Sequence, residues 1–157
     1  MADIDEFSGR SALITGGTRG IGKGIADRLR AGGARVVVAR EVGAATKHPD
    51  DVIAADVSTA DGVATLGAEA LDRLGSVDIL VHNVGGSGQY DGGAAALTDE
   101  DWQSALNANL LAAVRLDRAI IPGMVTRAVR GPSCTSRRSS AARRCPPPSP
   151  TRRRRPR

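Results

Sequence analysis

The sequence predicts an α/β fold in which the strands of one parallel sheet alternate with helices. Short apolar runs recur along the first half of the chain, and each is followed by a segment with helical spacing or by a polar connection. The run at residues 35–39 is almost continuously apolar, as expected of a strand covered on both faces. A glycine-rich turn at residues 16–22 joins the first run to the first helical segment. These three observations predict a doubly wound sheet.

The apolar runs are expected to form parallel strands of a single sheet, because crossovers between parallel strands are right-handed. The expected strands are residues 12–15, 35–39, 52–55 and 77–81. The first helix is expected over residues 21–29, with Ile21, Ile25 and Leu29 on one inward face. Gly32-Gly33 is expected to end it.

Two further helices follow the third and fourth strands. Ser58 or Thr59 is expected to cap the second helix, which continues to about Leu74. Its expected inward residues are Val63, Leu66, Ala70 and Leu74. The third helix is expected to begin at Thr98, because acidic residues follow it and suit a first turn. Pro122-Gly123 is expected to end this helix.

Charge divides the chain into two parts. Residues 1–126 carry 11 Lys and Arg against 17 Asp and Glu, a net charge of −6. Residues 127–157 carry 11 Arg and no acidic residue, a net charge of +11, and they lack any apolar period. Prolines at 146–150 exclude a helix or a central strand there. We therefore expect one folded domain at 1–126 and a disordered basic tail at 127–157.

Several classes of protein are disfavoured by composition. No apolar run approaches the roughly 20 residues of a membrane span. The acidic N-terminal segment lacks the form of a signal peptide, so a soluble cytoplasmic protein is expected. Both cysteines, Cys134 and Cys145, lie in the tail, which gives no disulfide framework. His48 and His82 are isolated in the sequence, and no metal site is expected. His82 is interpreted as a strand-end packing or hydrogen-bonding residue.

The glycine turn carries the clearest chemical signal. Thr15–Gly22 follows a strand and opens a helix, so glycines and the free N–H groups of a helix N-terminus come together. Glycines let the backbone approach a pyrophosphate closely. This arrangement predicts a nucleotide-binding site.

Four motifs resemble, in order and spacing, those of the short-chain dehydrogenase/reductase family, single-domain oxidoreductases that use NAD or NADP. Thr15–Gly22 resembles the coenzyme turn, and Asp56-Val57 resembles the pair that contacts adenine. His82–Gly85 resembles the family's Asn-Asn-Ala-Gly element with two substitutions. Leu106–Leu110 resembles the helix that carries the catalytic asparagine.

The resemblance covers residues 7–126 and implies a Rossmann-like sheet, of which the first four strands and their helices are present. It implies hydride transfer between the coenzyme and a small carbonyl or alcohol substrate. Asn109 maps to the catalytic asparagine. The implied coenzyme-binding residues are Gly16, Thr18, Arg19, Gly20, Ile21, Gly22, Arg40, Asp56, Val57, Asn83, Val84 and Gly85. Intact relatives form homo-oligomers through later helices, so association of this chain is in doubt.

The end of the second strand favours NADP over NAD. A free ribose 2′-hydroxyl suits a carboxylate, whereas a 2′-phosphate requires cationic partners. Arg40 ends this strand, and Arg19 lies in the glycine turn. A guanidinium presents planar, forked donors that match phosphate. If instead Arg40 is merely solvated and Glu41 faces the ribose, NAD is the coenzyme.

The family's proton-transfer pair is not found in the sequence. In the family a Tyr exchanges a proton with the substrate oxygen, a Lys four residues later lowers the pKa of that Tyr, and a Ser orients the substrate. The only tyrosine here is Tyr90, and Ala94 stands four residues after it. The only lysines are Lys23 and Lys47. Little or no turnover is therefore expected.

A change of reading frame within about residues 127–131 would explain the tail. Codons for Cys134–Ser140, read one base out of register, can spell an apolar residue followed by His-Val-Ser-Ser-Ile-Gln. In that frame the positions of Thr151 and Arg155 can encode Tyr and Lys, the first lying 13 residues after the second Ser. This separation resembles that of the family's Ser and Tyr.

Two other functions remain as alternatives. The chain could bind the coenzyme without catalysis, with its fourth strand left as an exposed sheet edge. The arginine-rich tail could instead bind nucleic acid through phosphates. Because the tail has no aromatic residues to stack on bases, a specific nucleic-acid partner is not expected.

Overall fold

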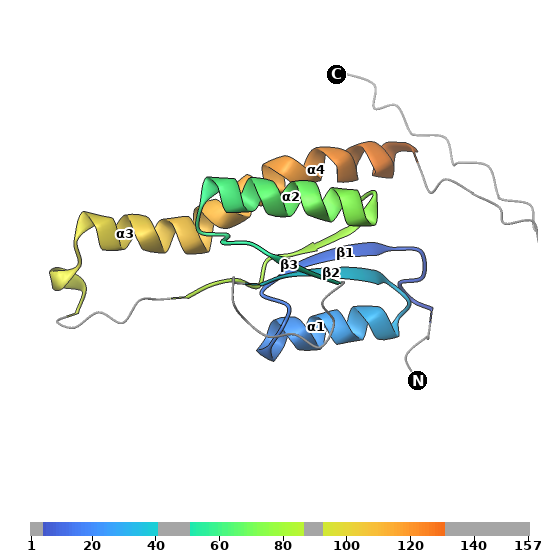
Figure 1. The fold of residues 1–157 in the computed structure, drawn as a ribbon, viewed down its shortest axis with the longest axis horizontal. Helices are drawn as coiled ribbons and strands as arrows, with labels where there is room; N and C mark the ends of the chain where they lie inside the picture. The colour runs from blue at the N-terminus through green and yellow to red at the C-terminus, as the bar shows by residue number, and fades with distance from the viewer. Residues whose placement is uncertain (1–4, 41–50, 87–92, 131–157) are drawn as a thin grey trace, which may run out of the picture.

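The computed structural model describes residues 5–40, 51–86 and 93–130. Its strands form one parallel sheet in the order β3-β2-β1-β4 (Figure 1). The strands are Ser11–Thr15 (β1), Arg35–Arg40 (β2), Val52–Ala54 (β3) and Ile79–Val81 (β4). In the register of the sheet, Leu13 of β1 pairs with Val37 of β2 and with Leu80 of β4. The expected parallel sheet is confirmed, with β3 and β4 shorter than predicted.

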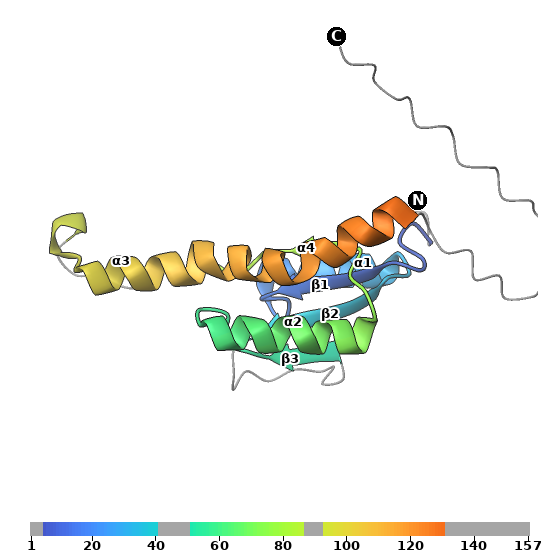
Figure 2. The same cartoon turned by 90° about the horizontal axis from the view of Figure 1, so that it is seen from above.

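Helices cover both faces of the sheet. They are Gly20–Ala31 (α1), Ala60–Leu74 (α2), Asp99–Leu106 (α3) and Ala112–Arg130 (α4), with a 3-10 turn at Ala94–Ala96 (η2) and a π-helical segment at Asn107–Leu111 (η3). Figure 1 shows α1 on one face of the sheet and α2 with α4 on the other. Figure 2 shows α3 reaching beyond the end of the sheet.

Alternate residues of the strands supply two separate hydrophobic cores. Leu13 and Val37 belong to the core beneath α2 and α4, which includes Leu66 and Leu116. Their chain neighbours face the other way, because successive side chains of a strand point to opposite faces. Ala12, Ile14, Val36 and Val38 therefore pack with Ala26 and Leu29 of α1. This two-sided burial explains the continuously apolar second strand.

Capping of the later helices follows the sequence expectation. Thr59 caps α2 by accepting a hydrogen bond from the amide of Gly62 at 3.0 Å. Thr98 and Asp101 form a reciprocal capping box at the start of α3. The predicted inward residues of α2 are all buried: Val63, Leu66, Ala70 and Leu74.

The predicted inward face of α1 is wrong at Ile21. This side chain is 79% exposed, whereas the buried residues of the helix are Gly22, Ala26 and Leu29. A residue without a side chain is needed at position 22, because the helix begins against the backbone of the glycine turn. That contact fixes the helix rotation and turns Ile21 outward.

The predicted helix end at Pro122-Gly123 is also wrong, because α4 continues through Pro122 to Arg130. Proline removes one helical hydrogen bond, but contacts on both sides of it hold the helix. Ile120 and Met124 pack on the same core. Beyond them, Arg127 hydrogen-bonds Ser76 and lies 3.1 Å from a carboxylate oxygen of Asp78.

Strand β4 is the outer strand on one side of the sheet within the described residues, as expected of an incomplete fold. Several apolar side chains of α3 and η3 are exposed as well, namely Trp102, Leu106 and Leu110. The predicted disordered tail, residues 127–157, is wrong at its start, because residues 127–130 form the last turn of α4. Residues 131–157 lie outside the described ranges. Across the described helices, none is long and apolar enough to cross a membrane.

Candidate coenzyme and active site

The glycine turn is held by backbone hydrogen bonds to the neighbouring strand β2. The amides of Gly16 and Gly17 both donate to the carbonyl oxygen of Ala39 in β2, at 2.9 and 3.3 Å. Gly16 has a φ of +66°, a conformation that other residues rarely adopt. The turn is thus anchored at the carboxyl end of the sheet.

Gly22 brings the first turn of α1 against the glycine turn. A Cβ atom at this position would lie 2.3 Å from the carbonyl oxygen of Gly16 and 2.4 Å from Nδ2 of Asn83. Both contacts are closer than van der Waals distance, so a larger residue cannot enter without movement of the backbone. Close packing of α1 on the glycine turn therefore depends on the absence of a side chain at position 22.

The N-terminus of α1 is open toward the turn. Its cap residue, Arg19, makes no side-chain capping bond, and the first turn contains no acidic residue. Thr18 is half-buried, Arg19 and Gly20 are exposed, and Gly20 has a φ of +55°. Uncapped amides at a helix N-terminus attract anions. This is the local arrangement that a pyrophosphate requires.

Thr15 joins the carboxyl ends of β1 and β4 beside this turn. Its Oγ1 accepts hydrogen bonds from the amides of Asn83 and Val84, at 3.0 and 3.2 Å, and donates to the carbonyl oxygen of Val81 at 3.4 Å. The side chain of Asn83 donates to the carbonyl oxygen of Gly16 at 3.0 Å. Sequence reasoning placed Thr15 at the start of the turn but assigned it no role.

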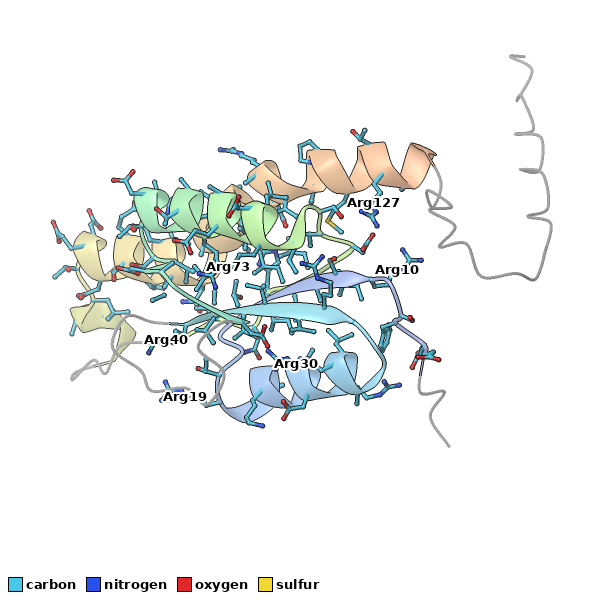
Figure 3. The ribbon with its side chains drawn as sticks, turned by 45° about the vertical axis from the view of Figure 1, so that its right-hand side comes forward. Arg10, Arg19, Arg30, Arg40, Arg73 and Arg127 are labelled. Carbon is cyan, nitrogen blue, oxygen red and sulfur yellow. The ribbon has the colours of Figure 1, made fainter. Side chains whose placement is uncertain are left out.

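Two guanidinium nitrogens of Arg40 are unsatisfied within the described residues. Within the part of the chain that the structure describes, its Nε and Nη1 atoms are buried and have no hydrogen-bond partner. Figure 3 shows Arg40 and Arg19 on the side of the molecule where α1 begins. Buried donors without partners are costly, and an anion would satisfy them. Glu41, the alternative residue for the ribose, lies outside the described residues.

Asp56 lies in a tight turn after β3. Its Oδ1 accepts hydrogen bonds from the Ser58 hydroxyl at 2.7 Å and from the Ser58 amide at 2.9 Å. These bonds hold the pKa of Asp56 below its usual value, the side-chain bond having the larger effect. The exposed carboxylate therefore stays ionised, while Val57 beside it packs on the core.

Asn109 lies in the π-helical segment η3, an irregularity that is frequent at functional sites. Its Oδ1 accepts from the amide of Gly86 at 3.0 Å, and its Nδ2 donates to the carbonyl oxygens of Gly86 and Ala105, at 2.7 and 2.9 Å. A Cβ atom on Gly85 would lie 3.2 Å from Oδ1 of Asn109. The asparagine thus fixes the segment that leaves β4.

The separate motifs meet around a small cavity of about 30 Å³ at the carboxyl end of the sheet. Its lining includes Thr15, Val57, His82, Val84 and Asn109. His82 Nε2 lies 2.9 Å from Oδ1 of Asp117, in agreement with its predicted role as a hydrogen-bonding residue. Within the described ranges no group of His, Cys, Asp and Glu residues could hold a metal ion.

The family model for short chain dehydrogenases matches residues 10–132. The chain belongs to the short-chain dehydrogenase family. The match includes each element that forms the cavity, from the glycine turn to Asn109. The resemblance inferred from the sequence motifs is confirmed.

Known short-chain dehydrogenases and reductases agree with this assignment over the same part of the chain. Nodulation protein G of Rhizobium sp. (strain N33) is 38% identical over 133 residues, which cover 78% of this chain and 52% of that protein. The 3-oxoacyl-[acyl-carrier-protein] reductase FabG of Vibrio cholerae is 30% identical over 128 residues, covering 77% of this chain and 52% of its own.

A solved structure of L-sorbose reductase from Gluconobacter frateurii, complexed with NADPH and L-sorbose, is 33% identical with a TM-score of 0.67. The similarity covers 78% of this chain and 50% of that one. A short chain dehydrogenase from Mycobacterium smegmatis is 27% identical, with a TM-score of 0.66 and 76% of this chain covered. The chain spans about half the length of the curated relatives it matches.

Proposed function

We propose that the folded part of this chain binds NADP(H), and that Arg40 and Arg19 receive the 2′-phosphate. The observation that carries the proposal is that Nε and Nη1 of Arg40 are buried without a partner among the described residues, on the side of the molecule where the uncapped N-terminus of α1 lies. One site then offers amides for the pyrophosphate and forked cationic donors for a further phosphate. Gly22 supports the same assignment, because it lets the first turn of α1 pack closely against the glycine turn.

The remaining predicted residues fit the other parts of the coenzyme. We assign Asp56 and Val57 to the adenine, because the ionised carboxylate can accept a hydrogen bond from the exocyclic amine. Val84 lines the cavity on the side of β4, and Asn83 and Gly85 are its neighbours in the chain. Bound NADPH would supply a hydride to a small carbonyl substrate. Asn109 is proposed as the residue that supports proton transfer in such a reaction.

Calorimetric titration of the full chain with NADPH and NADH tests the coenzyme proposal. Tighter binding of NADPH is expected, and Arg40→Met should reduce this preference by about tenfold. Arg118→Met provides a matched control, because Arg118 is an exposed arginine of α4. Absence of binding of both coenzymes would refute the proposal. Equal binding of both would favour NAD, the alternative coenzyme.

We further propose that this chain has little or no oxidoreductase turnover. The proposal rests on the absence of Tyr-x-x-x-Lys from the sequence. Lys23 is bound to Asp27 on α1, and Tyr90 and Lys47 lie outside the described residues. NADPH oxidation with a panel of carbonyl compounds is expected to stay at background. Turnover at ordinary enzyme rates would contradict this part of the proposal.

A shifted reading frame is our proposed origin of residues 127–157. Because Arg127 bonds Ser76 and lies beside Asp78, α4 keeps specific contacts with the domain up to this residue. The frame change is thus expected at or after Arg127. The DNA sequence tests the idea: the shifted frame should encode Ser and Tyr-x-x-x-Lys followed by further strands. A shifted frame without them would exclude it.

Coenzyme binding without catalysis, the alternative drawn from the sequence, uses this same site and agrees with the two proposals taken together. A nucleic-acid function of the arginine-rich residues has less support, since no aromatic side chains accompany them. Because reduced nicotinamide coenzymes are supplied inside the cell, we propose a cytoplasmic location. We propose a small carbonyl or alcohol compound as the substrate of a protein translated in the intact reading frame.

A further inference from the structure

Arg115 of α4 connects two segments that border the candidate coenzyme site. Its Nη1 donates a hydrogen bond to the carbonyl oxygen of Ser58 at 3.3 Å, and its Nη2 donates to Oδ1 of Asn107 at 3.2 Å. Ser58 follows the Asp56-Val57 pair, whereas Asn107 begins the π-helical segment that contains Asn109. One partly buried guanidinium therefore bonds the expected adenine loop and the expected catalytic segment.

Among the described residues, the other hydrogen bonds of the loop at residues 56–59 run within the loop and to the start of α2. Ser58 donates twice to the carboxylate of Asp56, and Thr59 donates to the Asp56 carbonyl oxygen through its amide and its hydroxyl. The amide of Gly62 donates to Thr59. These bonds set the shape of the turn but do not attach it to α4. Arg115 supplies a hydrogen bond that does.

The geometry of arginine suits this connection. The guanidinium is planar, and its donors point in fixed directions, so two acceptors bound to one group are held at a set separation. The acceptors here come from residues 49 positions apart in the chain, Ser58 and Asn107. Loss of the guanidinium would let the 56–59 loop move relative to the cavity, even though each segment kept its own internal bonds.

We propose that Arg115 is a positioning residue for coenzyme binding, which holds the Asp56–Ser58 loop at the place where it meets the adenine. The inference rests on the proposed NADP(H) site. It differs from a general structural role, because its loss should affect ligands that reach the loop and spare those that contact only the glycine turn.

Two small probes separate these parts of the site in the full chain. The compound 2′,5′-ADP contains the adenine and the 2′-phosphate, whereas inorganic pyrophosphate would contact the glycine turn alone. Arg115→Met is expected to weaken 2′,5′-ADP binding by about fivefold, the loss expected from one to two hydrogen bonds, and to leave pyrophosphate affinity unchanged. Arg115→Lys keeps the positive charge but lacks the planar pair of donors, so its affinity for 2′,5′-ADP should lie between those of Arg115→Met and the unaltered chain.

Arg118→Met is the control, since it removes an exposed arginine from the next turn of the same helix. All titrations are made where urea unfolding shows each variant to be folded. If Arg115→Met does not fold, Arg115→Lys decides the matter through the same two probes. The inference would be overturned if Arg115→Met lost equal affinity for both probes, or if its affinity for 2′,5′-ADP did not fall. If the unaltered chain binds neither probe, the proposed function itself fails.

Discussion

Arg127 Nε lies 3.1 Å from Oδ1 of Asp78, whose side chain is only 6% exposed. The other oxygen of this carboxylate accepts the amide of Ser11 at the start of β1, at 2.9 Å. Asp78 thus ties the last part of α4 to the amino end of the sheet. A carboxylate this deeply buried depends on its cationic partner, because removal of one member of such a pair leaves an uncompensated charge.

Arg127→Met is therefore expected to reduce the free energy of unfolding by about 1 kcal/mol, as measured by urea denaturation. The value is modest because the Arg127 side chain is itself 46% exposed, and because Arg10 lies 3.7 Å from the same carboxylate. Arg118→Met, on the exposed face of α4, should change stability little. An unfolding free energy equal to that of the unaltered chain would show that the contact does not stabilise the fold.

Gly22→Ala is expected to destabilise the chain by about 2 kcal/mol and to weaken NADPH binding, because the new Cβ would meet backbone that cannot easily move. Gly24 is the matched control: it lies two positions further along α1, and a Cβ atom there would meet nothing within 4 Å. Gly24→Ala should stabilise the helix by about 0.5–1 kcal/mol. Thermal unfolding and calorimetry check both variants. Equal behaviour of the two alanines would contradict the packing argument.

Thr15→Val should cost about 1–3 kcal/mol, since the partly buried amides of Asn83 and Val84 would lose their acceptor. Thr15→Ser retains Oγ1 and is expected to keep most of the stability. Hydrogen exchange at these two amides provides the local readout. Exchange should accelerate in Thr15→Val and change little in Thr15→Ser; the opposite order would show that the methyl group, not the hydroxyl, matters.

Ser58→Ala should raise the pKa of Asp56 toward its ordinary value of 3.8, because the larger of the two stabilising hydrogen bonds is removed. The pKa is lower in the folded state than in the unfolded state. The associated stability is thus present above pH 3.8 and is lost as the pH falls through the folded-state pKa. Carboxyl NMR titration measures the change, and an unaltered pKa of Asp56 would rule out this cause.

Local sequence patterns predicted the sheet, the capping residues and the glycine turn. These features depend on neighbours in the chain: alternation of apolar residues, a threonine followed by its partner three residues later, or glycines at a strand end. In the structure Thr15, Val84 and Asn109, which come from three separate motifs, line one cavity. Parallel strands end at a common edge, so residues that follow different strands are brought together by topology alone.

The face of α1 and the end of α4 could not be derived in this way. Ile21 continues the apolar spacing of α1, yet close contact of Gly22 with Gly16 decides the rotation of the helix. A proline usually ends a helix. Helix α4 nevertheless continues past Pro122, because Met124 and Arg127 make contacts with the rest of the domain. In both cases packing outweighs a local propensity of comparable or smaller energy.

The sequence by itself determined the fold class, the family and the order of the site motifs, because each is encoded in short segments at regular spacing. Only the tertiary structure decided that Arg40 carries buried donors without partners in the described residues, and that Arg115 bonds both Ser58 and Asn107. Those relationships join residues far apart in the chain. They depend on how the helices pack on the sheet, which short-range sequence patterns do not specify.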